Sequence, residues 1–169
     1  QATKASGNGG FQMMVLAPST VQEAVDLTYQ AFEYADRDLN PVLILADGVI
    51  CTMMEPVVLP DMKSEEEITQ IKANKRKWAC VGHNFEQETK SWIQPCRWDT
   101  VEMQKLNEEA AAMYETWEKD IRVEEYKTKD AELIITAYGI CGRIAKSAAD
   151  VLRKEGYKAG VIRPITVSP

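Results

Sequence analysis

This sequence of 169 residues contains a single histidine, His83, so reactions that need two histidines are excluded, along with most zinc sites. Four widely spaced cysteines include no Cys-x-x-Cys pair, which argues against an iron–sulfur cluster in this chain and favours reduced thiols. Cys80 and His83 have a metal-like spacing, but only Cys96 lies near enough to help, so we expect no metal site.

Long apolar runs are also missing, and none approaches the length that crosses a bilayer. No basic-then-apolar leader marks the chain for secretion. Basic residues are outnumbered, 20 against 26 acidic ones, whereas a nucleic-acid partner requires a basic face. We therefore expect a cytoplasmic protein with no membrane and no nucleic-acid partner. Its 45% hydrophobic residues are enough to build a core.

Charge divides the chain into three parts. Residues 1–60 carry 2 basic and 7 acidic residues, residues 61–130 carry 12 and 16, and residues 131–169 carry 6 and 3. All four tryptophans lie in the middle part. Dense charge with interspersed tryptophan indicates a connector that wraps over a surface and docks its aromatic rings on neighbours.

Residues 13–46 have the pattern of a β-α-β unit. Continuous apolar runs at 13–17 and 42–46 predict two buried, parallel strands. Between them a helix is predicted to about residue 36, capped by Ser19 with Gln22 or by Thr20 with Glu23. Its apolar stripe is predicted to comprise Val21, Ala24, Val25, Thr28, Ala31, Phe32 and Ala35.

The last part repeats this plan, with a strand at 133–138, a helix at 141–154 and a strand at 159–162. Before it, Asp99 is predicted to cap a long helix whose packing stripe runs from Met103 to Ile121. A single β-α-β unit does not bury both faces of its own sheet. We therefore expect this chain to be an internal piece of a longer one.

Asp47 and Gly48 directly follow the second predicted strand. Ligands of open parallel sheets bind beyond the carboxyl ends of the strands, so this pair is a candidate lip of a cofactor or substrate cleft. Asp-Gly is also among the commonest turn pairs, and the sequence leaves the two interpretations equal.

Other candidate groups carry weaker signals. The glycine-rich loop at residues 5–10 exposes backbone amides but precedes a strand, unlike a phosphate-binding loop. Gly139-x-x-Gly142 follows a strand and opens a helix, where Arg143 faces either an anion or solvent. Glu55 is either a solvent-facing carboxylate or a buried acid with a raised pKa. There is no nucleophile elbow, so these residues alone specify no reaction.

Several strings, taken together and in order, resemble the alpha subunit of 2-oxoacid:ferredoxin oxidoreductases, most closely the 2-ketoisovalerate (3-methyl-2-oxobutanoate) type. The strings are Gln1-Ala-Thr-Lys, the Gly-x-Gly loop, Val15-Leu-Ala-Pro, Val21-Gln-Glu, Asn40-Pro-Val-Leu-Ile-Leu-Ala-Asp-Gly48, Met53-Met-Glu-Pro56, Ala137-Tyr-Gly139, Arg143-Ile-Ala-Lys-Ser147, Leu152-Arg-Lys-Glu-Gly156 and Ile162-Arg-Pro-Ile-Thr166. The likeness covers nearly the whole chain and is weakest over residues 61–100.

The resemblance implies an enzyme of anaerobic metabolism that decarboxylates a 2-oxoacid, here a branched-chain one, on thiamine diphosphate. Electrons pass through iron–sulfur clusters on other subunits to ferredoxin, and the acyl group leaves on coenzyme A. Beta and gamma/delta subunits are the implied partners, and one of them shares the thiamine diphosphate and Mg²⁺ site. Ferredoxin is expected to dock on those other subunits, and the isolated chain is expected to be inactive.

The resemblance also implies an α/β fold. Residues 1–60 resemble the last part of a pyrimidine-binding domain of thiamine enzymes, and 131–169 the start of a transketolase C-terminal-like domain, joined by the connector at 61–130. By carry-over, Asp47, Gly48, Gly7 and Gly9 border the active-site cleft. The family's catalytic glutamate lies upstream of Gln1, so no catalytic residue is assigned here.

The chain departs from the family pattern at Asn8, Gly10 and Gln12, where relatives often carry His, Asp and Arg. This departure removes the charges that the loop would otherwise bring to a substrate. Two alternatives come from other functional classes. One is a non-catalytic assembly module that docks through the connector, and the other is a small-anion-binding module that uses residues 139–143.

Overall fold

The computed structural model describes residues 3–4, 7, 9–75, 78–80, 93 and 96–169. The chain divides into two compact units, one formed by residues 1–60 with 112–169 and the other by residues 61–111. Residues 112–130, which the charge pattern assigns to the connector, therefore pack with the first unit.

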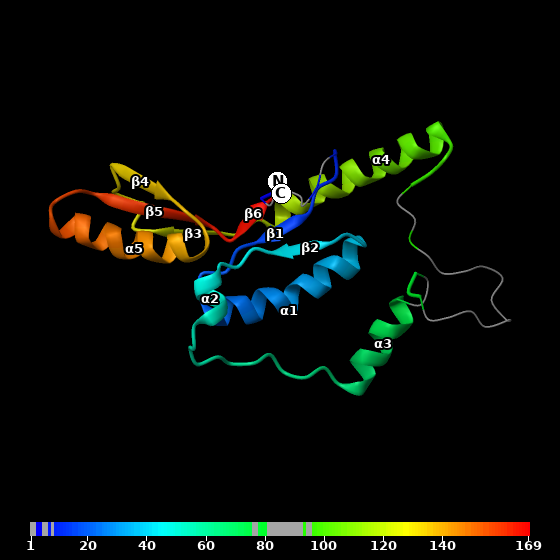
Figure 1. The fold of residues 1–169 in the computed structure, drawn as a ribbon, viewed down its shortest axis with the longest axis horizontal. Coiled ribbons are helices and arrows are strands. Elements are labelled where there is room, and N and C mark those ends of the chain that lie inside the picture. Colours follow the sequence, from blue (N-terminus) through cyan, green and yellow to red (C-terminus); the bar gives the residue numbers. More distant parts are fainter. Residues whose placement is uncertain (1–2, 5–6, 8, 76–77, 81–92, 94–95) are drawn as a thin grey trace. The chain divides into compact units, whose positions relative to one another are not determined.

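The first sheet has the strand order β2-β1-β6, with β1 at Met14–Leu16, β2 at Val42–Ile44 and β6 at Thr166–Ser168. Strands β1 and β2 are parallel, as the buried apolar runs predict, and β6 is antiparallel to β1. Strand β1 lies at the centre with every residue buried, whereas β2 is only half-buried. Helix α1, Val21–Asp38, runs along this sheet (Figure 1).

Helix α1 begins with the second of the two predicted caps. The Thr20 hydroxyl accepts a hydrogen bond from the Glu23 amide at 3.1 Å. The predicted apolar stripe is wrong in part, because Phe32 is 69% exposed, while Leu27, outside that stripe, is 3% exposed. The buried face is therefore centred on Leu27 and Ala31, about one position from the predicted one.

Trp117 completes the core of the first sheet. Its ring is 1% exposed and packs with Met14, Leu16 and Leu27, and its indole N–H donates to Asp38 at 2.9 Å. One tryptophan of the middle part thus docks as expected. Trp98, in contrast, is 95% exposed, so the expectation that the tryptophans dock is wrong there.

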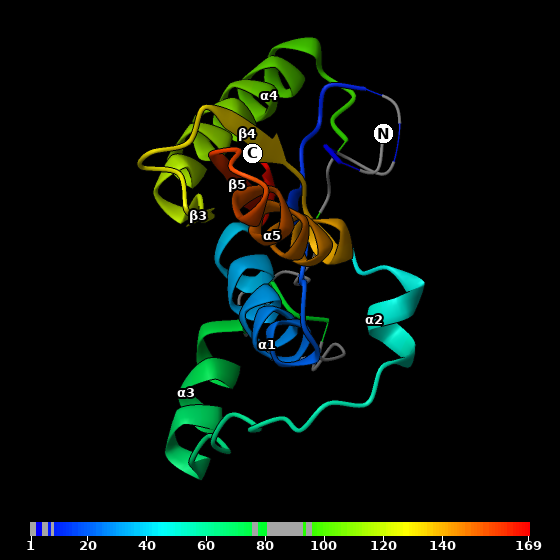
Figure 2. The same cartoon turned by 90° about the vertical axis from the view of Figure 1, so that its left-hand side faces the viewer.

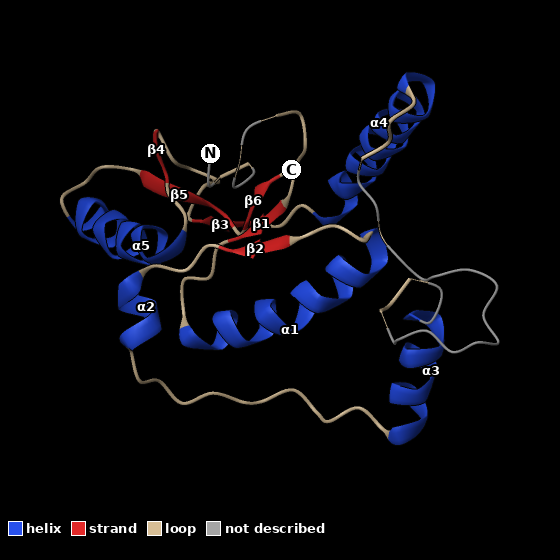
Figure 3. Cartoon of the chain, turned by 45° about the vertical axis from the view of Figure 1, so that its right-hand side comes forward, coloured by secondary structure: helices blue, strands red, loops and turns tan. Residues whose placement is uncertain are grey.

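The second sheet has the strand order β3-β5-β4, with β3 at Val123–Tyr126, β4 at Leu133–Thr136 and β5 at Ala159–Pro164. The predicted parallel pair is confirmed as β4 and β5, while β3 is antiparallel to β5. Helix α5, Gly139–Lys154, packs on one face through Ala145 and Ala149. Strand β5 continues into β6 after Ile165 alone, so one segment serves both sheets (Figure 3).

The second unit contains helix α3, Glu65–Lys75, and most of helix α4, Thr100–Glu115. The Asp99 carboxylate caps α4 as predicted, accepting from the amides of Val101 and Glu102 at 3.0 Å each. The helix does not run to Ile121, because the chain tightens into the 3-10 helix η1, Thr116–Asp120. The Thr116 hydroxyl donates to the Met113 carbonyl at 2.7 Å in this tightened turn.

Arg163 on β5 links the two sheets of the first unit. Its side chain is 2% exposed and donates two hydrogen bonds to Glu23 of α1, at 2.6 and 3.1 Å, and one to Glu124 of β3 at 2.6 Å. Lys146 of α5 also pairs with Glu124. Gly142 makes room for this guanidinium stem, since a Cβ there would lie 2.6 Å from the Arg163 Cδ atom.

These contacts determine the charge states of Arg163, Glu23 and Glu124, which we call the Arg163 cluster. Burial raises the pKa of Glu23, but hydrogen bonds from Arg163 and Ser19 outweigh it and hold the pKa below the ordinary 4.5. Burial also raises the pKa of Glu124, but hydrogen bonds from Lys146 and Arg163 outweigh it and lower the pKa. Burial alone would lower the pKa of Arg163, yet the two carboxylates raise it. All three groups are therefore charged at neutral pH.

Replacing Arg163 with alanine is expected to lower the free energy of unfolding by about 3 kcal/mol, because two partly buried carboxylates lose their partner. Urea unfolding followed by circular dichroism measures this loss. Lys158→Ala is the matched control, since the Lys158–Glu132 pair is 55% and 73% exposed, and it should change stability by less than about 0.5 kcal/mol. Equal losses in both variants would contradict the role assigned to Arg163.

The cluster also predicts how stability depends on pH. Since the pKa of Glu23 is lower in the folded chain than its ordinary 4.5, its contribution is complete above that value and declines as the pH falls below it. Glu23→Gln removes this titration, so its unfolding free energy should depend less steeply on pH in the acid range. Urea unfolding at pH 3 to 7 tests this expectation, and an unchanged slope would contradict it.

Candidate functional site

Asp47 and Gly48 lie where the chain leaves the carboxyl end of β2, as the sequence predicts. Asp47 is the N-cap of the short helix α2, Gly48–Thr52, and its Oδ1 accepts from the amides of Val49 at 2.7 Å and Ile50 at 3.1 Å. Ile50 anchors the helix with 3% exposure. The pair is therefore a helix start, and neither a free turn nor a loose loop.

Gly48 is exposed, and among the described residues no atom beyond its chain neighbours and the backbone of its own helix lies within 4 Å of the position where a Cβ would stand. The backbone is thus open at the carboxyl end of the strand, the side on which parallel sheets present ligand sites. The capping bonds fix one carboxylate oxygen of Asp47 towards its own helix. We call Asp47 and Gly48 the lip.

Gly7 and Gly9 occupy a different place. Their loop returns to the start of β1, where the Met13 amide donates to the Lys4 carbonyl at 3.0 Å. A Cβ at Gly7 would lie 3.2 Å from the Phe11 ring, and Gly9 has a φ of 108° that favours glycine. Since β1 and β2 are parallel, this loop enters at their amino ends and the lip lies at their carboxyl ends. The structure does not bring the two glycines to the lip.

Glu55 and Arg143, by contrast, do meet. The Arg143 guanidinium pairs with Glu55 at 2.8 Å, and the other Glu55 oxygen accepts from the Val21 amide at 3.1 Å. These two contacts, the backbone one foremost, lower the pKa of Glu55. The alternative of a carboxylic acid with a raised pKa is therefore wrong, and this group is no general acid near neutral pH.

The pairing also changes the interpretation of Arg143. Its side chain is 40% exposed but neutralised by Glu55, so it neither faces solvent alone nor offers a free cation to an anion. Sequence reasoning named both residues and missed their contact, because 88 positions separate them. At the same helix start, Gly142 packs closely on Ala137 and Arg163, so close helix–strand packing accounts for this glycine.

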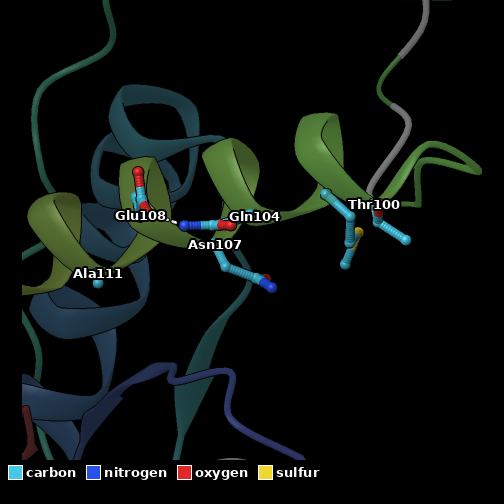
Figure 4. A pocket seen from close by; sticks show the side chains of 6 residues that line it. Thr100, Gln104, Asn107, Glu108 and Ala111 are labelled. Atoms are coloured by element: carbon cyan, nitrogen blue, oxygen red, sulfur yellow. Dashed lines mark hydrogen bonds between the residues drawn. The ribbon is translucent and has the colours of Figure 1, made fainter.

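A hollow on α4 is lined by side chains of that helix alone (Figure 4). Its residues are Thr100, Met103, Gln104, Asn107, Glu108 and Ala111. Gln104 donates to Glu108 at 2.8 Å, which ties up the carboxylate. A hollow formed by one helix face encloses nothing, so it is not a candidate active site.

Within the described residues, no three His, Cys, Asp or Glu side chains gather to hold a metal ion. Cys80 belongs to that part of the chain and His83 does not, so their pairing lies outside the described residues. All four cysteines are described, and they are exposed and reduced. No helix in the same residues is long and apolar enough to cross a membrane.

Comparison with known proteins identifies the family. The family described as "Pyruvate flavodoxin/ferredoxin oxidoreductase, thiamine diP-bdg" matches residues 3–127, and that described as "Pyruvate:ferredoxin oxidoreductase core domain II" matches residues 131–169. The lip therefore falls inside the thiamine diphosphate-binding match.

Individual relatives agree. The ketoisovalerate oxidoreductase subunit VorB of Methanothermobacter marburgensis is 40% identical over 100% of this chain and 46% of its own length. The 2-oxoglutarate synthase subunit KorA of Archaeoglobus fulgidus is 28% identical over 96% of this chain and 45% of its own. The pyruvate synthase subunit PorA of Pyrococcus horikoshii is 31% identical over 88% and 40%.

The chain spans less than half the length of these relatives. Their names match the resemblance that the ordered strings indicate, and the resemblance is confirmed. The chain belongs to the pyruvate flavodoxin/ferredoxin oxidoreductase family, and most of its length lies in that family's thiamine diphosphate-binding domain.

Proposed function

We propose that this chain is part of a 2-oxoacid:ferredoxin oxidoreductase that acts on a branched-chain substrate of the 2-ketoisovalerate class. The reaction converts a 2-oxoacid, coenzyme A and oxidised ferredoxin into an acyl-CoA, CO₂ and reduced ferredoxin. The observation that carries the proposal is the 40% identity to a ketoisovalerate oxidoreductase subunit along the whole chain. Identity to the 2-oxoglutarate and pyruvate relatives is 28% and 31%, which favours the branched-chain class.

We also propose that thiamine diphosphate and Mg²⁺ are shared with a beta subunit. The proposal takes the Mg²⁺ and diphosphate ligands from that beta subunit. What this chain offers is the lip, an open backbone with one fixed carboxylate at a strand's carboxyl end. Iron–sulfur clusters and the ferredoxin contact belong, in this proposal, to gamma/delta subunits in the cytoplasm.

The domain assignment follows from the same family. Residues 1–60 are proposed to be the last part of a pyrimidine-binding domain, residues 61–130 a connector, and residues 131–169 the start of a transketolase C-terminal-like domain. Parallel pairing of β1 with β2, and of β4 with β5, supports this assignment. Asp47 and Gly48 are proposed to border the active-site cleft, whereas the amino-end position of Gly7 and Gly9 gives them no support from the geometry.

Substrate preference tests the proposed reaction. The assembled enzyme containing the full-length chain should reduce ferredoxin with 2-ketoisovalerate at a kcat/KM about tenfold or more above that for pyruvate or 2-oxoglutarate. Reduction should require both thiamine diphosphate and coenzyme A. A preference for pyruvate would overturn the branched-chain assignment, and turnover without thiamine diphosphate would overturn the cofactor.

The lip predicts a cofactor effect. Asp47→Ala removes the N-cap of α2, a loss of about 1 kcal/mol, and should weaken thiamine diphosphate binding by the assembled enzyme about fivefold. Calorimetric titration measures the affinity. Asp47→Asn should retain most of it, because asparagine caps a helix as well as aspartate.

Asp99→Ala is the matched control for this experiment. Asp99 caps α4 through the same pair of amide contacts but does not belong to the lip. Its loss should leave thiamine diphosphate affinity unchanged. If both alanine variants weaken binding equally, the effect comes from general destabilisation and the lip has no role.

A further inference from the structure

The segment from Met54 to Pro60, which we call the strap, presents apolar side chains outward. It follows α2 as an extended chain without helix or strand (Figure 2). The side chains of Met54, Val58 and Leu59 are 99%, 79% and 70% exposed. Three large apolar side chains are thus exposed within six residues, and apolar groups exposed close together often mark interaction sites.

The strap backbone is nevertheless held in place. Glu55 is fixed by the Val21 amide and Arg143. Three residues further on, the Gln22 side chain forms two hydrogen bonds with the Val58 backbone, accepting from its amide at 2.7 Å and donating to its carbonyl at 2.9 Å. Gln22 therefore anchors Val58 through the backbone while the valine side chain points outward.

Two prolines add to this order. Pro56 and Pro60 flank Val58 and Leu59 and fix φ near the polyproline value, which lowers the entropy that the strap would lose on binding. A segment already held in its extended form binds a groove at lower cost than a mobile loop. The anchors thus explain how exposed apolar groups are kept ready for contact.

The charges beside the strap are acidic. Gln22 also donates to Asp26 at 2.9 Å, which brings that carboxylate next to the anchor of Val58. Asp61 follows the strap directly, and residues 1–60 carry 7 acidic against 2 basic residues. The nearby cation, Arg143, is neutralised by Glu55. A complementary surface is therefore apolar at its centre and basic at its rim.

We propose that the strap docks into an apolar groove, rimmed by lysine or arginine, on another subunit of the same oxidoreductase. This inference rests on the proposed function only in taking the partner from the same enzyme. A second copy of this chain fits less well, because its strap brings the same acidic rim and like charges would face each other.

The test uses the complex assembled from the full-length chain and its partner subunits, with subunit association measured by native mass spectrometry and sedimentation. Val58→Asp combined with Leu59→Asp should weaken association about tenfold or more. Phe32→Asp is the matched control, since Phe32 is 69% exposed and lies outside the strap, and it should leave association unchanged. Equal effects of the two variants, or none, would overturn the proposal.

Three further measurements test the anchor, the charged rim and the identity of the occupant. Gln22→Ala frees the strap without altering its apolar side chains, so it should weaken association about threefold through the added cost of ordering. Raising the salt concentration should weaken the unmodified complex, because the rim is electrostatic. Sedimentation of the full-length chain alone shows whether the chain binds a second copy of itself. A dimer that disappears in the double variant would assign the strap to a second copy and overturn the proposal.

Association is measured without turnover, so the two proposals fail separately. If the complex forms through the strap but shows no activity with 2-oxoacids, the proposed function fails and the docking surface remains. If the double variant assembles normally and turns over 2-ketoisovalerate, the docking surface fails and the function remains. Circular dichroism of each variant confirms that substitutions at these exposed positions leave the fold intact.

Discussion

The first unit depends on one buried cation. Arg163 binds a carboxylate at the start of α1 and another on β3, so the helix that covers one sheet is fixed to the strands of the other. Burying a guanidinium is costly, and the cost is offset only because both carboxylates and Lys146 complete the charge pattern. Gly142 is required for the same reason, since any larger residue would occupy the space of the arginine stem.

The start of α5 is also linked to the chain that leaves α2. Helix α5 begins beside Pro18, where Gly139 has a φ of 58° and a Cβ would lie 3.6 Å from the Pro18 carbonyl oxygen. The next turn of α5 carries Arg143, whose guanidinium pairs with Glu55. This ion pair fixes the chain that leaves α2. The starts of α1 and α5 and the chain that leaves α2, which lie far apart in the sequence, are thus joined by contacts at Pro18 and Glu55. Charge pairing, and not apolar contact alone, makes this connection.

Local patterns predicted strands β1, β2, β4 and β5, their parallel pairings and the caps at Thr20 and Asp99, because each depends on a few adjacent residues. Strands β3 and β6 and the helices α2 and α3 were not predicted. The buried face of α1 was misjudged at Phe32, since helical spacing alone does not determine which of two neighbouring stripes meets the sheet. Contacts between distant residues left no local signal: 140 positions separate Glu23 from Arg163. The position of Asp47 after a strand and that of Gly7 and Gly9 before one were predictable, whereas the Glu55–Arg143 pair required the structure.

Strands β5 and β6 pair with strands on the other side of the boundary between the two family matches. The two family matches meet between residues 127 and 131, in the loop that joins β3 to β4. Yet β3 from the first match pairs with β5 from the second, and β6 from the second match pairs with β1 from the first. A cut in that loop would leave two complementary peptides, each with strands whose partners lie in the other. The boundary seen in sequence families is therefore not a boundary of independent folding.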